Sequence, residues 1–271
     1  MRLDGYLQRI GWQGDRSPTI DLLQNLLQAH SYAIPFENLD VQLGRPLTTS
    51  VDEAYDKIVG RRRGGWCYEQ NGLFGWALET IGFNVQRTAA TVMRAERGPE
   101  AHANHLMLVV QVPDDDRRWL VDVGFGGSLQ APIVLEPQAC EHSPYQVGLQ
   151  VLDDGFWQFW ERHGDACLSY DFEDSPGDER AMSERCDFLQ TNPASSFVLN
   201  LVCQRRRSDT HTILRGRVMS RLLASGTEKR LLKSADEFAT VIRDEFRLDV
   251  PDAAALWPQV CERHAEIESE L

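Results

Sequence analysis

A glycine pair that leads into a cysteine, with one tryptophan between them, constrains this chain more than any other stretch of its sequence. Residues 62–71 read RRGGWCYEQN, and apolar residues at helical spacing follow up to residue 81, where Gly82 ends the pattern. The pattern predicts a helix that begins at or near Cys67. Unpaired N–H groups and the helix dipole favour a thiolate at such a position. The stretch alone fits a reactive nucleophile and a buried structural cysteine equally well.

The composition is that of an ordinary globular chain and argues against several classes of protein. The chain has 271 residues, 42% hydrophobic and 25% charged, which suffices for one large domain or two to three smaller ones. Its net charge of −13 argues against nonspecific nucleic-acid binding. No apolar run approaches ~20 residues and the start lacks a signal-peptide core, so we expect no membrane segment and a cytoplasmic location. Six cysteines without a CxxC pair indicate reduced thiols and no metal site.

Three regions of the chain differ in their secondary-structure pattern. Up to about residue 84 the apolar spacing predicts a small bundle with helices at roughly 18–30, 51–59 and 67–81, and a loop at 34–40. The middle is β-rich and predicts an antiparallel barrel or sandwich with strands at 85–92, 106–112, 119–123 and 156–161. Towards the end, strands at 197–203 and 211–218 precede two helices, which begin at the Ser234 capping box and near residue 252.

A histidine and an aspartate on neighbouring strands are the candidate partners of Cys67. His105 begins an apolar run, and Asp122 lies inside another, where a charge usually has a partner. If the turn centres on residues 113–116, residue 105 lies opposite residue 124, and His105 and Asp122 become diagonal neighbours on one face. A register shift of one residue would separate them.

Alternatives to this pairing stay open at the level of the sequence. Asp122 can instead cap a turn while His105 is a satisfied core histidine, and His102, in the preceding loop, is a rival base. With His105, the three residues predict a Cys-His-Asp triad, in which the base holds the thiolate and the carboxylate orients the base. Such a triad performs acyl transfer, either to water or to another nucleophile.

Several stretches, taken in order, resemble the arylamine N-acetyltransferase family. They are Tyr6-Leu7 with Arg9-Ile10-Gly11, IPFENLD at 34–40, RRGGWCYEQN at 62–71, His105 before its apolar strand, and VDVGFG at 121–126. The resemblance covers the chain from the first helix to the C-terminal helices. Two departures are mild, because neither removes a catalytic group: Trp66 stands where Tyr or Phe is more usual, and Asn104 where Thr is common.

The resemblance implies an α+β fold in three parts with a papain-like Cys-His-Asp triad. The parts are a helical bundle carrying Cys67 (1–84), a central antiparallel β-barrel carrying His105 and Asp122 (85–190) and an α/β lid (191–271). The implied activity is a ping-pong transfer from acetyl-CoA, through a Cys67 thioester, to an arylamine, hydrazine or arylhydroxylamine. His105 would then be the base, and Asp122 would fix its tautomer.

The resemblance also marks residues around the substrates. Phe36 and Phe125 match aromatic positions that line the acceptor pocket, although either also fits a core residue. Gly124, Gly126 and Gly127 would let the pantetheine arm of coenzyme A pass close to the backbone. This set completes the predicted substrate and coenzyme contacts.

Charged residues outside the triad suggest two further contacts. Glu37 and Arg63 are expected to form an ion pair that braces the cysteine loop, or else to be two solvated charges. Residues 205–207, and Lys229 with Arg230 and Lys233, are candidate ligands for the coenzyme's phosphates. We favour the second group, although both also fit solvated surface.

Other enzyme classes share this kind of triad. A macrolactam-forming amide synthase carries the same signature but takes its acyl chain from a carrier protein. A cysteine hydrolase or a transglutaminase would attack amides without acetyl-CoA. We therefore expect small-molecule acceptors and coenzyme A as partners, no nucleic acid and no membrane, and the sequence leaves a homodimer open.

Overall fold

A computed structural model describes residues 1–269 of the chain. Its first part is helical, with α1 (Leu3–Ile10), α2 (Ile20–Ala33), α3 (Leu39–Gln42), α4 (Val51–Tyr55), a π-helical turn (Asp56–Gly60) and α5 (Cys67–Ile81). Helix α2 begins after Thr19, whose hydroxyl accepts a hydrogen bond from the Leu22 N–H. Helix α5 begins at Cys67 and ends at Gly82, whose left-handed conformation (φ 119°) favours glycine. The predicted start and end of the cysteine helix are confirmed.

Two short elements differ from the predicted pattern of this part. Helix α1 forms in the polar start of the chain because Tyr6, Leu7 and Ile10 lie on one buried face. The predicted loop at 34–40 contains the two-residue strand β1 (Phe36–Glu37) and the start of α3. Strand β1 forms because it has a pairing partner far along the chain, which no local pattern shows.

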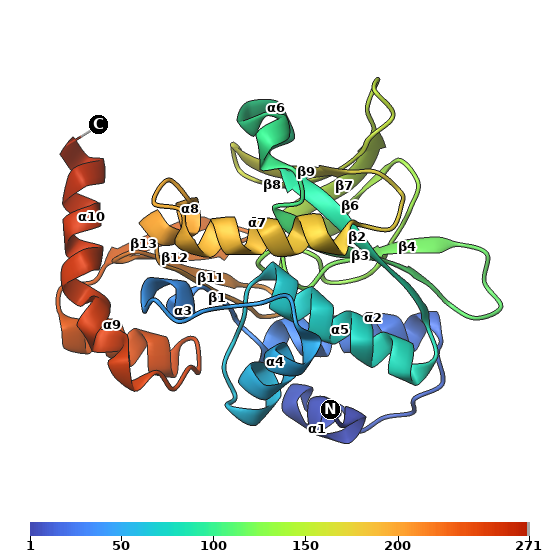
Figure 1. Cartoon of the computed structure of the whole chain (residues 1–271), viewed down its shortest axis with the longest axis horizontal. Helices are drawn as coiled ribbons and strands as arrows, with labels where there is room; N and C mark the ends of the chain where they lie inside the picture. The colour runs from blue at the N-terminus through green and yellow to red at the C-terminus, as the bar shows by residue number, and fades with distance from the viewer. Residues whose placement is uncertain (270–271) are drawn as a thin grey trace.

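The middle of the chain forms an antiparallel sheet of eight strands. They are β2 (Asn84–Val92), β3 (His105–Gln111), β4 (Arg118–Val121), β5 (Ile133–Val134), β6 (Gln138–His142), β7 (Tyr145–Val151), β8 (Trp157–His163) and β9 (Ala166–Phe172), paired in the order β5-β4-β3-β2-β9-β8-β7-β6. Helix α6 (Arg94–Arg97) and a 3-10 turn (Pro99–Ala101) lie between β2 and β3. Within residues 1–269 the edge strands β5 and β6 do not pair with each other, so the predicted barrel is present as a curled, open sheet (Figure 1).

The last part of the chain forms a second sheet with flanking helices. Strands β10 (Val202–Arg206), β11 (His211–Arg215), β12 (Val218–Leu223) and β13 (Gly226–Leu231) join β1 in the order β1-β10-β11-β12-β13. The helices are α7 (Glu179–Thr191), α8 (Ser196–Leu199), α9 (Ala235–Asp244), a 3-10 helix (Pro251–Leu256) and α10 (Trp257–Ser269). Figure 1 shows α10 at one end of the molecule, apart from α1 and α2.

The strand predicted at 197–203 is wrong over residues 197–201. Ser195 caps a helical turn there, since its hydroxyl accepts a hydrogen bond from the Phe197 N–H, and the strand begins only at Val202. The strand predicted at 211–218 is interrupted by a turn at Gly216 (φ 56°). Helix α9 begins as predicted, because the Glu237 N–H donates to the hydroxyl of Ser234.

Three clusters of buried apolar side chains hold these elements together. One joins α1, α2 and α5 to the eight-stranded sheet, and a second joins the five-stranded sheet to α9 and α10. The third contains Trp66, Cys67, Leu106, Met182 and Leu189, and it lies where the helical part, the large sheet and α7 meet. The boundaries at residues 84 and 190 remain a prediction. Within residues 1–269 no helix is both long and apolar enough to cross a bilayer.

Candidate active site

The loop before Cys67 is clamped against strand β1. The Glu37 N–H donates to the Gly65 carbonyl at 3.1 Å, and the Gly65 N–H donates to the Pro35 carbonyl at 3.3 Å. A side chain at Gly64 would collide with the Pro35 carbonyl, so only glycine permits this approach. The carboxylate of Glu69 accepts a hydrogen bond from the Trp66 N–H at 3.1 Å, which caps α5. The loop therefore fixes Cys67 at the first position of its helix.

A network of buried ion pairs connects this loop to α3, the π-helical turn and α5. Arg63 Nη2 lies 2.8 Å from Glu37 Oε1 and 3.1 Å from Asp40 Oδ1. Lys57 Nζ lies 3.0 Å from Asp40 Oδ2 and 2.9 Å from Glu69 Oε1. The Glu37–Arg63 pair was predicted, and the alternative of two solvated charges is wrong because both side chains are buried. Asp40, Lys57 and Glu69 were not predicted to take part.

The histidine and aspartate lie beside the cysteine in the predicted register. Leu108 pairs with Val121, so residue 105 lies opposite residue 124 and His105 is the diagonal neighbour of Asp122. His105 Nε2 lies 2.7 Å from Asp122 Oδ2, and both side chains are buried. The diagonal pairing is confirmed, and the alternative of Asp122 as a turn cap unconnected to His105 is wrong.

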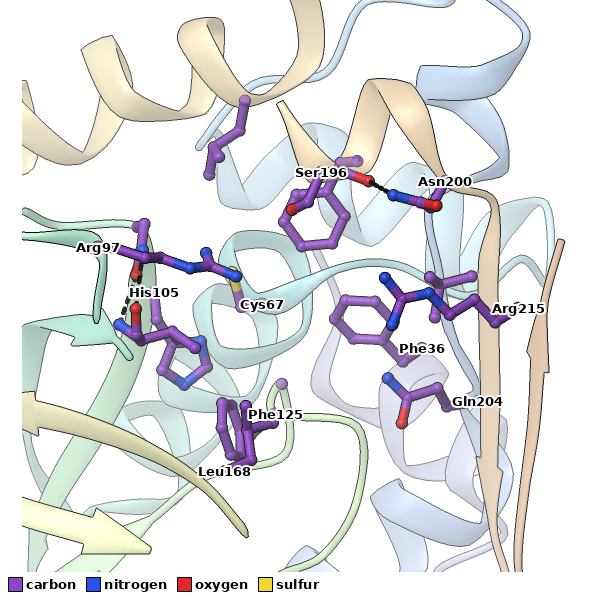
Figure 2. Close-up of a pocket in the computed structure, with 16 residues that line it drawn as sticks. Phe36, Cys67, Arg97, His105, Phe125, Leu168, Ser196, Asn200, Gln204 and Arg215 are labelled. Carbon is purple, nitrogen blue, oxygen red and sulfur yellow. Dashed lines mark hydrogen bonds between the residues drawn. The ribbon is translucent and has the colours of Figure 1, made fainter. Parts of the chain in front are cut away.

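The imidazole is held in its charged form. Burial lowers the pKa of His105, but the adjacent Asp122 carboxylate and a hydrogen bond with Cys67 outweigh it and raise the pKa to about 10. Because Nε2 contacts Asp122, Nδ1 is the nitrogen left to face the sulfur, and Figure 2 shows the two side chains next to each other. His102 is exposed and lines a different hollow on the surface, so it is not placed to act as the base.

Asn71 links the helix that carries Cys67 to Asp122, and sequence reasoning did not single it out. It lies one helical turn after Cys67, and its Nδ2 donates to Asp122 Oδ1 at 2.8 Å and to the Leu106 carbonyl at 2.6 Å. Its Oδ1 accepts from the Val123 N–H at 3.0 Å. The i to i+4 spacing from a candidate nucleophile is the signal that could have found it, since such residues share a helix face.

The glycines after Asp122 play different structural parts. The Gly124 N–H donates to Asp122 Oδ1 at 2.8 Å, and a Cβ on Gly124 would lie 2.7 Å from Cys67 Cα and 2.6 Å from Asn71 Nδ2. Gly124 therefore lets the segment after β4 lie directly against the start of α5. Gly126 and Gly127 have φ near 98° and pack against Gln204 and Arg206, and neither glycine is among the residues that line the cavity at Cys67.

A cavity of about 210 Å³ opens above the sulfur. Its walls combine apolar side chains with amides, a serine hydroxyl and two arginines: Phe36, Val92, Phe125, Leu168, Leu189, Phe197, Val202, Asn104, Asn200, Gln204, Ser196, Arg97 and Arg215. Figure 2 shows the cavity with Phe36 and Phe125 labelled among these walls. Phe36, Gly124 and Phe125, three of the five predicted contact residues, line it. The ring of Phe125 also packs on His105, with 5.3 Å between ring centroids. A cavity of roughly 150 Å³ holds one benzene ring, so this one suits a single substituted ring.

A larger hollow of about 850 Å³ adjoins the first between α10 and the five-stranded sheet. The two share Asn200 and Arg215, and the larger one is also lined by Arg217 and Lys229. Four of the six predicted phosphate ligands already have partners in the protein, among them Arg207, whose Nη2 lies 4.0 Å from Glu245 Oε2. Arg205 donates to the Glu245 carbonyl, Arg206 is buried against backbone carbonyls of residues 142–143, and Arg230 pairs with Glu237. Of the favoured group, Lys229 lines this hollow.

Another buried carboxyl lies close enough to Asp122 for the two charges to interact. Burial raises the pKa of Glu161 to about 8, with the negative charge of Asp122 adding to the rise and Ser128 and Arg206 opposing it. Glu161 is therefore mostly protonated at neutral pH. It adds no full charge to the surroundings of the histidine–aspartate pair.

Comparisons with known proteins agree with this geometry. A family model described as N-acetyltransferase matches residues 19–255. The arylamine N-acetyltransferase of Mycolicibacterium smegmatis is 38% identical over 94% of both chains, and that of Escherichia coli is 32% identical over 93% of this chain and 90% of the relative. The solved structure of the Mycobacterium marinum enzyme in complex with CoA has a TM-score of 0.86 at 34% identity, covering 96% of this chain and 98% of that chain. The chain belongs to the arylamine N-acetyltransferase family of acyltransferases.

Proposed function

We propose that this enzyme transfers an acetyl group from acetyl-CoA to an arylamine, hydrazine or arylhydroxylamine through a thioester on Cys67. The observation that carries the proposal is the contact of Cys67 with a charged His105 that Asp122 and Asn71 hold in place. A solved relative that binds CoA supports the choice of donor. Cys67, His105 and Asp122 are thus the proposed catalytic residues.

The first half-reaction loads the enzyme. The Cys67 thiolate forms a bond to the acetyl carbon, the bond between that carbon and the coenzyme sulfur breaks, and the departing thiolate takes the proton held by His105. Exchange of one thioester for another needs little free energy, so binding and positioning set its rate.

The second half-reaction makes the amide. The amine nitrogen forms a bond to the acetyl carbon, His105 takes the proton that the nitrogen loses, and the Cys67 thiolate leaves. Asp122 keeps Nδ1 directed at the reacting atoms and stabilises the imidazolium. Because the acetyl group waits on the enzyme between two substrates, the kinetics should be ping-pong.

The larger hollow is the proposed place for the phosphate end of the coenzyme. Pantetheine separates the sulfur from the first phosphate by a chain on the order of 15 Å when extended, so the phosphates lie outside the 210 Å³ cavity. The neighbouring hollow offers apolar walls together with Arg217 and Lys229. We include Gly124, which lines the first cavity, among the proposed contacts of the arm.

The size of the first cavity favours a small acceptor over the long acyl chain of a macrolactam synthase. Mass spectrometry after incubation with acetyl-CoA tests the proposal directly. Wild-type protein should gain one acetyl group, located on Cys67 by peptide mapping, and Cys67→Ala should gain none. Initial-rate plots at several acceptor concentrations should be parallel. Acetylation at another residue, or intersecting lines, would contradict a Cys67 thioester as the intermediate.

A further inference from the structure

A hollow of about 320 Å³, here called the arginine hollow, lies where four segments of the chain meet. It is lined by residues from the end of α1, the end of α2, the loop before α5 and the segment after α9: Gln8, Arg9, Ile10, Gly11, Ala33, Arg62 and Arg247. Three of these seven residues are arginines and none is acidic, in a chain whose net charge is −13. The hollow shares no lining residue with the cavity above Cys67 or with the larger hollow beside it. A concave site lined by one sign of charge raises the local concentration of ligands of the opposite sign.

The two exposed arginines of this hollow have no partner in the part of the chain that the structure describes. Within residues 1–269, neither the Arg62 nor the Arg247 guanidinium forms an ion pair or donates a hydrogen bond, whereas Arg61 pairs with Asp56 and Arg63 belongs to the network of buried ion pairs. The φ angles of Arg62 and Arg247 are 54° and 56°, a left-handed conformation that favours glycine. Residues with side chains that adopt such a conformation cluster at ligand clamps and active sites. Both guanidinium groups are therefore available to bind a ligand.

Arg9 is the buried arginine of the hollow, and it contacts the loop that leads to the cysteine. Its Nε donates to the Ile58 carbonyl at 2.9 Å, and its Nη1 donates to the Ala33 carbonyl at 2.9 Å. Its Nη2 donates to the Arg63 carbonyl at 3.2 Å. The hollow is thus connected through Arg9 to the backbone that positions α5.

Positive charges around the arginine hollow oppose one another. Burial, and after it the charge of Arg62, lower the pKa of Arg9 to about 10. Burial, and after it the charge of Arg247, lower the pKa of the neighbouring Arg205 to about 10. The Glu245 carboxylate counters the effect at Arg205, but it already lies 2.7 Å from another arginine. An anion with more than one negative charge would offset this repulsion, and it would also outweigh the partial negative charge at the C-terminus of α1.

We propose that the arginine hollow binds a phosphate group, with Arg62 and Arg247 as its ligands. A phosphate monoester carries a charge of about −1.5 to −2 at pH 7 and has three strong acceptor oxygens. Guanidinium groups bind such oxygens through paired, charge-assisted hydrogen bonds. The volume of the hollow leaves room for a small organic group on the phosphate. The site is separate from the proposed acetyl transfer, because the donor's acetyl group must reach a sulfur that lies in a different cavity.

Calorimetric titration of the whole protein with sodium phosphate or with glycerol 3-phosphate, at an ionic strength held constant with sodium chloride, tests the site. We expect Arg62→Gln and Arg247→Gln each to raise Kd by roughly tenfold. Arg61→Gln is the matched control and should leave Kd unchanged, because Arg61 is an exposed neighbour that pairs with Asp56 and does not line the hollow. At ten times Kd, phosphate should raise the Tm of the wild type by about 3 °C and that of the double variant by much less.

The two probes also identify the source of the phosphate. Tighter binding of glycerol 3-phosphate than of inorganic phosphate would assign the site to a phosphorylated organic molecule, and the reverse order would assign it to the free ion. Glycine variants separate binding from folding, because glycine adopts a positive φ without strain. Arg62→Gly and Arg247→Gly should therefore keep the Tm of the ligand-free protein while losing affinity as the glutamine variants do.

Three results would overturn the proposal. One is the same Kd for the wild type and the Arg62→Gln/Arg247→Gln double variant. Another is no binding of either probe to the wild type at about 10 mM, which would leave the hollow without useful affinity. The third is a rise in KM for acetyl-CoA in the double variant but not in Arg61→Gln, since this would assign the two arginines to the donor.

Discussion

Replacing Asn71 by alanine should damage both the stability and the chemistry of this enzyme. The buried amide makes three hydrogen bonds: to the Leu106 carbonyl, to the Asp122 carboxylate and from the Val123 N–H. A bond to a charged group contributes about 1.5–3 kcal/mol and a neutral one about 0.5–1.5 kcal/mol. Their loss should therefore lower the free energy of unfolding by about 3–5 kcal/mol, which corresponds to a fall in Tm of about 10 °C.

The effect on the reaction follows from the freedom that Asp122 gains. Its Oδ1 would keep only the Gly124 N–H as a partner, so the carboxylate and His105 can move relative to the sulfur. A misplacement of about 1 Å costs about 100-fold in rate. We expect the rate of Cys67 acetylation to fall by this factor. Rapid quenching and mass spectrometry, at a temperature where the variant is folded, measure that rate.

The control is Asn84→Ala, because Asn84 is an exposed asparagine at the start of β2. This substitution should change neither the free energy of unfolding nor the rate of Cys67 acetylation. Asn71→Ser keeps a small polar group and is the second variant if Asn71→Ala does not fold. A folded Asn71 variant that is acetylated within twofold of the wild-type rate would refute the reasoning, since the hydrogen bonds of Asn71 would then not position Asp122 and His105.

Four further predictions test other parts of the site. Cys67→Ala should abolish acetyl transfer while circular dichroism shows an intact fold. The pKa of His105 is raised to about 10 in the folded protein, from about 6.5 in the unfolded chain, so its contribution to stability is fully present below pH ~6.5 and is lost as the pH rises towards ~10. Urea unfolding of the wild type should show this loss of stability. Asp122→Asn should make the stability depend less on pH and should lower the acetylation rate by several orders of magnitude. Gly124→Ala should destabilise the protein by about 1–3 kcal/mol, because its methyl group would press on Cys67 Cα; unchanged unfolding and activity would show that the loop can move aside. Lys229→Gln should raise KM for acetyl-CoA but leave acetylation by p-nitrophenyl acetate unchanged, and equal effects on both donors would remove Lys229 from the phosphate site.

The sequence predicted those parts of the site that depend on local rules. The helix start at Cys67 follows from apolar spacing and flanking glycines, and the His105–Asp122 pairing follows from a turn whose centre sets the strand register. Both rest on residues fewer than 20 positions apart. The ion pair between Glu37 and Arg63 was expected only because both belong to recognisable motifs.

The parts that were missed depend on contacts between distant segments. In the sequence Lys57 is typical of a surface charge, but in the folded protein its ammonium group lies between Asp40 and Glu69. Arg97 and Arg215 come from α6 and β11, and only the folded chain brings them to one cavity. The strand predicted at 197–203 was wrong because a serine cap at residue 195 outweighed the β propensity that follows it.

The two-residue strand β1 has a consequence for how the protein is made. Its partner in the sheet is β10, where Phe36 pairs with Gln204, and the same strand clamps the backbone before Cys67. A ribosome adds about 5–20 residues per second, so the clamp lacks its partner for many seconds after the cysteine has emerged. The nascent chain can fold its helices and the large sheet in that interval, but the wall of the cavity formed by Gln204 and Arg215 is still missing. This cavity is therefore completed only late in synthesis, and chains truncated before β10 should contain Cys67 but lack the cavity wall that the proposed acceptor would contact.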